Sequence, residues 1–313
     1  MSEPLAIGVD LGGTKIAFAL VDRQGAVLHV QRAPTLAGEG PGAVLDRIAG
    51  GIEALLAQAG RPVAGIGIGS PGHLDPVAGV VHHAVNLAWR DVRVYDELRG
   101  RLPAGLPLFL QKDTNASAVG EMLFGAARGE RDFVYLAAGT GLGGAAVAGG
   151  RLVTGAWNNA MEVGHLSLDP NGRRCGCGTR GCAETVVSGL GLLAGVRERG
   201  ADFPASPLSG APDLTTQAIL AAADKSDPLA LAVLDDAGRA LGEVMAACAC
   251  LFNPALIVIG GGMGRAAARW LMPVAQRELR RRVFPPAVDR LRVAESEITI
   301  SAVGAACLVW YDQ

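Results

Sequence analysis

A strand–turn–strand pattern that occurs twice is the feature that most constrains the fold of this chain. Apolar runs over residues 5–10, 16–22 and 26–30 are separated by LGGTK and RQG, and residues 133–153 again place a Gly/Thr turn between two apolar runs. Such runs, joined by Gly-containing turns, predict an antiparallel meander of strands. Its recurrence predicts two related structural units within one chain.

Helical and strand patterns alternate after each repeat. Because this alternation is typical of α/β layers, we expect an α/β fold with two lobes and a central cleft. The smaller predicted lobe consists of residues 1–113 together with the C-terminal helix 300–313. The larger predicted lobe consists of residues 114–299. The expected helices are 42–59, 114–127, 184–198, 214–222, 228–251, 264–282 and 302–311, and the further strands are 64–70, 108–113, 255–264 and 291–296.

The composition excludes several classes of partner. Half of the 313 residues are apolar, the formal net charge is −2 and the basic residues are dispersed, so neither nucleic acid nor a membrane surface is an expected partner. The N-terminus lacks a basic segment followed by an apolar stretch, and no apolar run approaches the roughly 18 residues of a membrane-spanning helix. We therefore predict a cytoplasmic protein, in which clustered cysteines are more plausible as metal ligands than as disulfides.

Three glycine-rich stretches raise the alternative of a dinucleotide-binding enzyme. The pattern Gly-x-Gly-x-x-Gly occurs over 67–72 and 139–144, and a looser version occurs over 260–264. The dinucleotide fingerprint requires a helix to begin at its last glycine. Residues 73–75 instead continue as a predicted loop, and the stretch after Gly144 is short and broken by glycines. No P-loop pattern occurs either. Nicotinamide and flavin binding are therefore disfavoured.

The turn DLGGTK, residues 10–15, predicts a phosphate-binding loop. Its glycines allow backbone NH groups to approach an anion, Thr14 adds a hydroxyl donor and Lys15 adds a positive charge. A carboxylate beside a polyphosphate normally serves Mg²⁺, and Asp10 is the candidate. Residues 138–144, AGTGLGG, repeat this composition, and the glycines at 260–262 offer a surface without side chains to a base or ribose. Each loop alone also fits an ordinary hairpin turn, but the three together favour nucleotide binding.

A cluster of potential metal ligands lies in the middle of the chain. One imidazole and three thiols make a Cys₃His set suited to a closed, structural Zn²⁺ site: His165, Cys175, Cys177 and Cys182. The alternative, reduced thiols in a surface loop, is poor because exposed cysteines oxidise readily. A rigid metal site would also fix the two carboxylates that flank it, Glu162 and Glu184. The other cysteines, Cys248, Cys250 and Cys307, lie in apolar stretches and are expected to be buried.

These motifs, in this order, resemble those of the ROK (repressor, open reading frame and sugar kinase) family of the actin-like ATPase superfamily. DLGGTKI is similar to its first phosphate motif, and GIGSPGHLD with GVVHHAVNL, within 67–87, is similar to its sugar-binding segment. KDTNA resembles its catalytic segment, GTGLGG its second phosphate motif, EVGH with the cysteine run its zinc signature, and VIGGG its adenosine motif. The resemblance covers nearly the whole chain. It implies the two-lobed actin-like (ribonuclease H-like) fold.

The resemblance also implies a function, an ATP- and Mg²⁺-dependent kinase that phosphorylates the 6-hydroxyl of glucose to glucose 6-phosphate. Asp113, which local sequence leaves as either a helix N-cap or a base, is implied to be the general base. The implied sugar ligands are Gly72, Asn86, Asp113, Glu162, His165 and Glu184. The implied ATP ligands are Asp10, Gly12, Gly13, Thr14, Lys15, Thr140, Gly141, Gly143, Gly260, Gly261 and Gly262, with Asp10 serving Mg²⁺. The implied ligands of a structural Zn²⁺ are His165, Cys175, Cys177 and Cys182.

One position departs from the family pattern, and two alternatives stay open. The family usually has Asn, which commonly contacts the sugar, before the catalytic aspartate, whereas this chain has Lys112. Within the enzyme class, the alternative is a kinase for fructose, mannose or an N-acetylhexosamine. A sugar-responsive transcriptional regulator is the remote alternative, disfavoured because the first strand begins at about residue 5 and leaves no room for a DNA-binding module. Relatives are usually dimers or tetramers, which predicts a homodimer or homotetramer.

Overall fold

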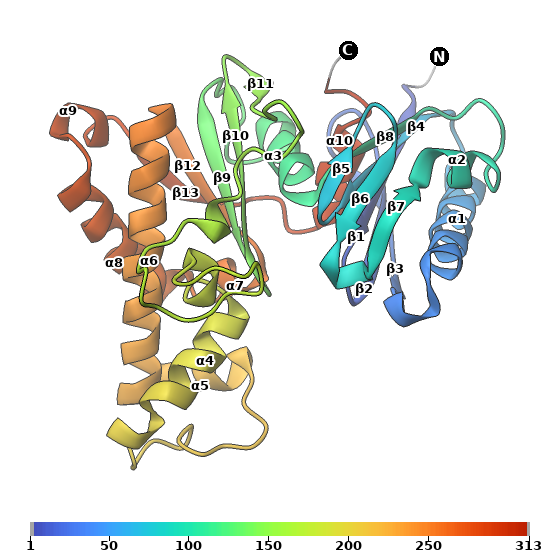
Figure 1. The fold of residues 1–313 in the computed structure, drawn as a ribbon. Helices are drawn as coiled ribbons and strands as arrows, with labels where there is room; N and C mark the ends of the chain where they lie inside the picture. The colour runs from blue at the N-terminus through green and yellow to red at the C-terminus, as the bar shows by residue number, and fades with distance from the viewer. Residues whose placement is uncertain (1–2, 312–313) are drawn as a thin grey trace. The chain divides into compact units, whose positions relative to one another are not determined.

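The computed structural model describes residues 3–311 and divides into two compact units (Figure 1). Unit 1 contains the chain up to Gly129, the segment Leu152–Ala160 and the chain from Glu297 onward. Unit 2 contains Glu130–Arg151 and Met161–Ser296. The lobe limits predicted from the sequence, 1–113 and 114–299, stay predictions.

A five-stranded sheet forms the centre of unit 1. Its strand order is β3-β2-β1-β4-β8, in which β1, β4 and β8 are parallel and the first meander supplies the antiparallel strands β2 and β3. The bounds are β1 Leu5–Leu11, β2 Lys15–Val21, β3 Val27–Pro34, β4 Val63–Ser70 and β8 Leu108–Lys112.

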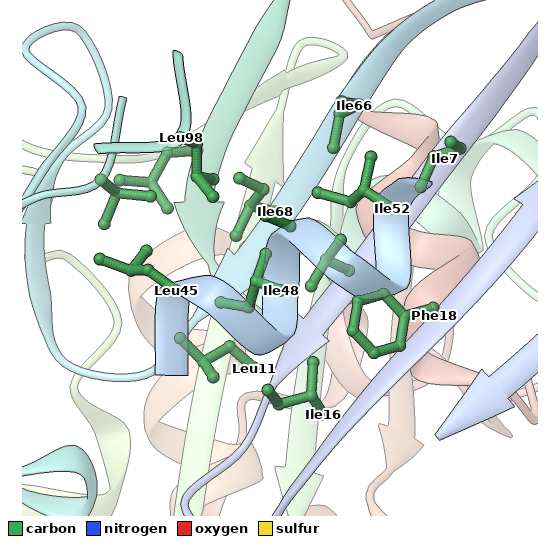
Figure 2. Close-up of a cluster of buried hydrophobic side chains, with 14 of the residues drawn as sticks. Ile7, Leu11, Ile16, Phe18, Leu45, Ile48, Ile52, Ile66, Ile68 and Leu98 are labelled. Carbon is green, nitrogen blue, oxygen red and sulfur yellow. The ribbon is translucent and has the colours of Figure 1, made fainter. Parts of the chain in front are cut away.

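Helix α1, Pro41–Gln58, covers one face of this sheet. Its apolar residues recur at helical spacing and are buried, among them Val44, Leu45, Ile48, Ile52 and Leu55. Figure 2 shows Ile48 and Ile52 packed with Ile7 and Phe18 of the strands. Phe18 lies so close to α1 that a Cβ at Gly51 would come within 2.4 Å of its ring. Burial of this apolar surface is the main force that holds α1 on the sheet.

Helices α3, Asp113–Phe124, and α10, Ser301–Cys307, belong to a second apolar cluster of unit 1. Residues of β1 alternate between the two clusters because successive side chains of a strand point to opposite faces. The backbone of α10 approaches the sheet closely at two glycines. A Cβ at Gly8 would lie 1.8 Å from the Ala302 carbonyl oxygen, and one at Gly67 would lie 1.8 Å from that of Ala305.

A three-stranded antiparallel sheet, β5-β6-β7, also belongs to unit 1. Its strands are β5 His73–Asp75, β6 Val80–Ala84 and β7 Trp89–Arg93, and helix α2, Val94–Arg99, follows. The prediction of a loop at 73–75 was therefore wrong. Strands of three to five residues have too little periodicity to be recognised from sequence. Trp89 of β7 is fully buried and joins this sheet to the first apolar cluster.

Unit 2 repeats the sheet pattern of unit 1. Its order is β11-β10-β9-β12-β13, with a β9–β10 hairpin followed by parallel pairing of β9, β12 and β13. The bounds are β9 Phe133–Ala138, β10 Leu142–Ala148, β11 Arg151–Leu152, β12 Leu256–Gly260 and β13 Arg292–Glu295. The predicted duplication of an α/β unit is confirmed.

Six α-helices complete unit 2 in the described residues: α4 Gly189–Arg199, α5 Thr216–Asp224, α6 Pro228–Phe252, α7 Gly262–Ala266, α8 Ala268–Arg282 and α9 Pro285–Val288. The long α6 and α8 pack along each other, and Gly242 of α6 permits this, because a Cβ there would lie 2.6 Å from the Ala275 carbonyl oxygen (Figure 1). The helix predicted at 264–282 is two helices, and the one predicted from 184 begins at Gly189, where the Ser188 hydroxyl caps it. None of the described helices is long and apolar enough to cross a membrane.

The close approach of α10 to the sheet gives a stability prediction. Gly67→Ala should lower the free energy of unfolding by about 1–3 kcal/mol, because the added methyl group collides with backbone that cannot move aside cheaply. Gly50→Ala is the matched control: Gly50 is exposed in α1 with open space around it, so the change should raise stability by up to about 1 kcal/mol. Urea unfolding of both variants measures the difference. Equal stabilities would contradict this packing.

Candidate functional site

Asp10 and Asp113 lie at the same edge of the unit 1 sheet. In the parallel pairing, Asp10 of β1 is opposite Gly69 of β4, and Gly69 is opposite Gln111 of β8. Asp113 follows β8 directly as the first residue of α3. Neighbouring strands are about 4.8 Å apart, so β1 and β8 are about 10 Å apart here. Ligands of α/β sheets bind outside the carboxyl ends of parallel strands, which makes this edge the candidate site of unit 1.

The Asp10 carboxylate is suited to a cation. Burial raises the pKa of Asp10 above its usual value, and a hydrogen bond from Ser301 and the charge of Lys15 oppose this rise only in part. Burial is costly for an unpaired negative charge, and a bound cation offsets that cost. The hard oxygen ligands of a carboxylate suit Mg²⁺.

The turn between β1 and β2 begins two residues after Asp10. The Gly12 amide donates to the Lys15 carbonyl oxygen at 3.0 Å, which closes the turn. Thr35, which follows β3, also stabilises the turn. Its hydroxyl donates to the Gly12 carbonyl oxygen at 2.6 Å, and its amide donates to the Thr14 carbonyl oxygen at 2.9 Å. Thr14 and Lys15 are exposed. The exposed hydroxyl of Thr14 and ammonium of Lys15, beside two glycines, are donor groups that a phosphate could use.

Two of the predicted sugar residues have neighbours in unit 1 that the structure defines: Asn86 lies next to this turn, and Gly72 lies against β6. Asn86 is in the short 3₁₀ helix η2, Val85–Leu87, and a Cβ at Gly13 would lie 3.0 Å from the Asn86 Cβ. Gly72 has φ +91°, and a Cβ there would lie 2.2 Å from the His83 carbonyl oxygen. Only glycine fits at position 72, because any side chain would collide with β6 and the backbone is left-handed. Packing alone therefore explains a glycine at this position.

Lys112 and Asp113 are held by different partners. The Oδ1 atom of Asp113 accepts the Thr114 amide at 2.7 Å, and Lys112 rather than Asp113 occupies the cap position of α3. The interpretation of Asp113 as the N-cap is therefore wrong. Lys112 is only 6% exposed, and its Nζ donates to the Ala160 carbonyl oxygen at 3.4 Å. The ammonium group that replaces the family's Asn thus contacts the segment Leu152–Ala160.

A polar network beside Asp113 was missed by the sequence analysis. The Oε1 atom of Gln111 accepts the side-chain amides of Asn115 at 3.1 Å and Asn158 at 2.9 Å. Asn158 has a left-handed backbone, with φ +56°. The network fastens the segment Leu152–Ala160 to the end of β8. No local pattern could have revealed it, because Asn158 is 47 residues from Gln111.

Two glycine loops of unit 2 lie side by side at the carboxyl ends of β9 and β12. The first, Gly139–Gly143, carries Thr140 and is closed by a hydrogen bond from the Gly139 amide to the Gly141 carbonyl oxygen at 2.8 Å. The second follows Gly260, where Gly261 has φ +80° and a Cβ would lie 2.3 Å from the Ala138 carbonyl oxygen. The pairing of β9 with β12 thus brings together two of the predicted nucleotide loops.

Glu184 is tied to the first of these loops. Its Oε2 atom accepts the Leu142 amide at 2.9 Å and fills the space beside Gly141, where a Cβ would lie 2.3 Å away. Glu184 belongs to the 3₁₀ helix η4, Ala183–Thr185, directly after Cys182. Glu162 is exposed and immediately precedes the 3₁₀ helix η3, Val163–His165. Glu162 and Glu184 therefore lie, along the backbone, next to the short helices that carry His165 and follow Cys182.

The four predicted metal ligands converge in unit 2. The ligand atoms of His165, Cys175, Cys177 and Cys182 all lie within 4.8 Å of one another. The Cys177 and Cys182 sulfurs are 3.6 Å apart, and the Cys175 sulfur is 3.7 Å from Nδ1 of His165. A tetrahedral zinc ion with Zn–S bonds of about 2.3 Å requires ligand atoms about 3.8 Å apart. The cluster therefore fits zinc.

The surrounding loop shapes the cluster. A hydrogen bond with the Thr179 hydroxyl, at 3.1 Å, is the main cause that lowers the pKa of Cys177 to about 6, whereas burial raises that of Cys175 to about 11. Gly181 has φ +69°, and a Cβ there would lie 1.6 Å from the Asp169 carbonyl oxygen. Only glycine therefore permits the fold that brings Cys182 to the other ligands.

The remaining cysteines differ from one another. Cys248 and Cys307 are buried among apolar residues, as predicted. This burial raises the pKa of both thiols to about 12. Cys250 is exposed, so its predicted burial was wrong. The physical reason is helical geometry: two positions along α6 from Cys248, a side chain points to the opposite side of the helix.

The chain is similar in sequence and in fold to known proteins over nearly its whole length. Residues 6–311 match the model of the ROK family. A glucokinase of Thermotoga maritima is 36% identical over 97% of this chain and 96% of its own length. A ROK family glucokinase from Streptomyces griseus, solved in complex with glucose and AMPPNP, is 32% identical with a TM-score of 0.83 over 97% of this chain and 98% of that one.

A regulator is similar as well. A ROK family transcriptional regulator, a homolog of the E. coli MLC protein, is 30% identical with a TM-score of 0.86 over 98% of this chain and 78% of that one. The two mixed five-stranded sheets are those of the actin-like ATPase fold found in ROK kinase structures. Sequence motifs, sheet order and these similarities lead to one conclusion: the chain belongs to the ROK family.

Proposed function

We propose that this protein is an ATP- and Mg²⁺-dependent kinase that phosphorylates the 6-hydroxyl of glucose. The observation that carries the proposal is the placement of Asp10 and Asp113 at one edge of the unit 1 sheet. Phosphoryl transfer to a hydroxyl requires charge neutralisation at the phosphates and an acceptor for the alcohol's proton. The two carboxylates can serve these two needs. The similarity to glucokinases supports glucose as the substrate.

Backbone amides would hold the nucleotide. In unit 1 the turn Gly12–Lys15 would bind phosphate oxygens, with Thr14 and Lys15 adding a hydroxyl and a positive charge. In unit 2 Thr140, Gly141 and Gly143 would contact phosphate, and Gly260–Gly262 would contact the adenosine. Bound through Asp10, Mg²⁺ would neutralise charge on the transferring phosphate.

Asp113 would act as the general base. Its carboxylate would accept the proton of the sugar's 6-hydroxyl while that oxygen forms a bond to the γ-phosphorus and the bond from this phosphorus to ADP breaks. The sugar would be bound by Gly72, Asn86, Glu162, His165 and Glu184, together with Asp113. The zinc held by His165, Cys175, Cys177 and Cys182 would be structural, because four protein ligands leave no open position. A homo-oligomeric state and a cytoplasmic location stay predictions.

Replacement of the base gives a direct test. Asp113→Asn keeps the size of the side chain but cannot accept the proton, so kcat should fall by about 10²- to 10⁴-fold while glucose affinity changes little. Asp96→Asn is the matched control, because Asp96 is an exposed α2 residue that pairs with Arg93 at 2.6 Å. Coupled ADP-release assays and calorimetry measure both variants. Wild-type turnover in Asp113→Asn would assign the base elsewhere.

A sugar panel tests the substrate. Glucose should give the highest kcat/KM when glucose, fructose, mannose, N-acetylglucosamine and N-acetylmannosamine are compared at saturating Mg²⁺ and ATP. A higher kcat/KM for another sugar would move the function to that kinase class. An absence of turnover with every sugar would refute the kinase proposal.

Metal content tests the zinc site. The purified protein should contain one zinc per chain, measured by mass spectrometry of its metals. Cys182→Ser should lose the metal, and because Glu184 follows two residues later, the KM for glucose should rise. Cys250→Ser removes an exposed thiol outside the cluster and should keep full zinc content. Full zinc occupancy in Cys182→Ser would remove Cys182 from the site.

A further inference from the structure

The C-terminal segment of unit 1 reaches the edge that carries Asp10. The chain enters unit 1 at Glu297, and α10 begins four residues later at Ser301. Gly8 of β1 and Gly67 of β4 let the backbone of α10 come into direct contact with these two strands. Because Asp10 is two residues after Gly8 on the same strand, the start of α10 is brought beside it.

A buried carboxylate fixes the approach to α10. Glu121 of α3 is fully buried, and its Oε1 atom accepts the Ile298 amide at 3.1 Å. Its Oε2 atom accepts the Ala126 amide at 2.8 Å. Charge-assisted bonds of this kind are among the stronger hydrogen bonds in proteins. The segment that leads to Ser301 is therefore held to the same helix that begins with Asp113.

The Ser301 hydroxyl donates a hydrogen bond to the Oδ2 atom of Asp10. This is a contact between residues 291 positions apart, and it is made by an exposed serine whose neighbours in α10 are buried. A carboxylate has two oxygens, so a hydroxyl on one of them sets the rotation of the group and leaves the other able to face a cation. Hydrogen bonds from residues that do not themselves touch the metal orient metal-binding carboxylates in this way.

We propose that Ser301 is a positioning residue for the nucleotide's metal ion, and that it acts by orienting the Asp10 carboxylate. The inference rests on the proposed function, because it takes Asp10 as the Mg²⁺ residue. It also gives the C-terminal helix a function in nucleotide binding, which no motif in the sequence assigns to it.

Calorimetric titration with AMPPNP, with Mg²⁺ or with EDTA and without sugar, tests the proposal on the full chain. Ser301→Ala should weaken binding in Mg²⁺ by about tenfold or more, and binding in EDTA should match the wild type. Ser301→Thr keeps the hydroxyl, so its AMPPNP affinity in Mg²⁺ should stay close to that of the wild type. Ser209→Ala is the control, since the Ser209 hydroxyl donates to backbone carbonyl oxygens in unit 2, and it should bind as the wild type does.

A double-mutant cycle separates positioning from a general loss of structure. If Ser301 acts through Asp10, then Ser301→Ala should add nothing to the loss caused by Asp10→Asn. Equal losses for Ser301→Ala in Mg²⁺ and in EDTA, or full additivity with Asp10→Asn, would overturn the proposal while leaving the kinase function intact. If Mg²⁺ does not change the AMPPNP affinity of the wild type, both this proposal and the Mg²⁺ role of Asp10 are overturned. Sugar-dependent ADP release would then test the kinase function on its own.

Discussion

The in-register parallel pairing of β1, β4 and β8 is the constraint on which the candidate site depends. It sets Asp10, Gly69 and Gln111 in one row across the sheet, so that Asp113 begins α3 at the edge where β1 presents its carboxylate. A shift of one residue along β1 would turn Asp10 to the other face and bring apolar side chains out of the core. The apolar clusters on both faces of the sheet therefore maintain the register that the chemistry requires.

Glycines serve two separate purposes in this chain. At Gly8 and Gly67 the absence of a side chain lets α10 approach the sheet, which is a packing requirement. In the turn after β1 glycines would let an anion approach the backbone closely, which is the binding requirement of the proposed phosphate loop. Gly141 is a packing requirement too, because the Glu184 carboxylate occupies the space that a side chain would need. A high glycine content is therefore a consequence of close backbone approach as well as of tight turns.

Features with a local pattern could be predicted from the sequence. The two hairpins, the long α6 and the Cys₃His cluster each depend on residues that are close in the chain or regularly spaced. The β5-β6-β7 sheet could not be predicted, because its strands are short. Contacts between distant segments, such as Gln111 with Asn158 or Ser301 with Asp10, have no local signature at all. For Asp113 the sequence left two interpretations, and the structure excludes the N-cap, because Lys112 occupies that position.

A crystal structure of the protein with glucose and a non-hydrolysable Mg²⁺–ATP analogue would test the central claim most directly. The account predicts that the 6-hydroxyl oxygen of glucose lies about 2.6–3.2 Å from a carboxylate oxygen of Asp113, with the metal ion coordinated by Asp10 directly or through water. A sugar whose 6-hydroxyl faces away from Asp113, or a metal ion bound far from Asp10, would contradict it.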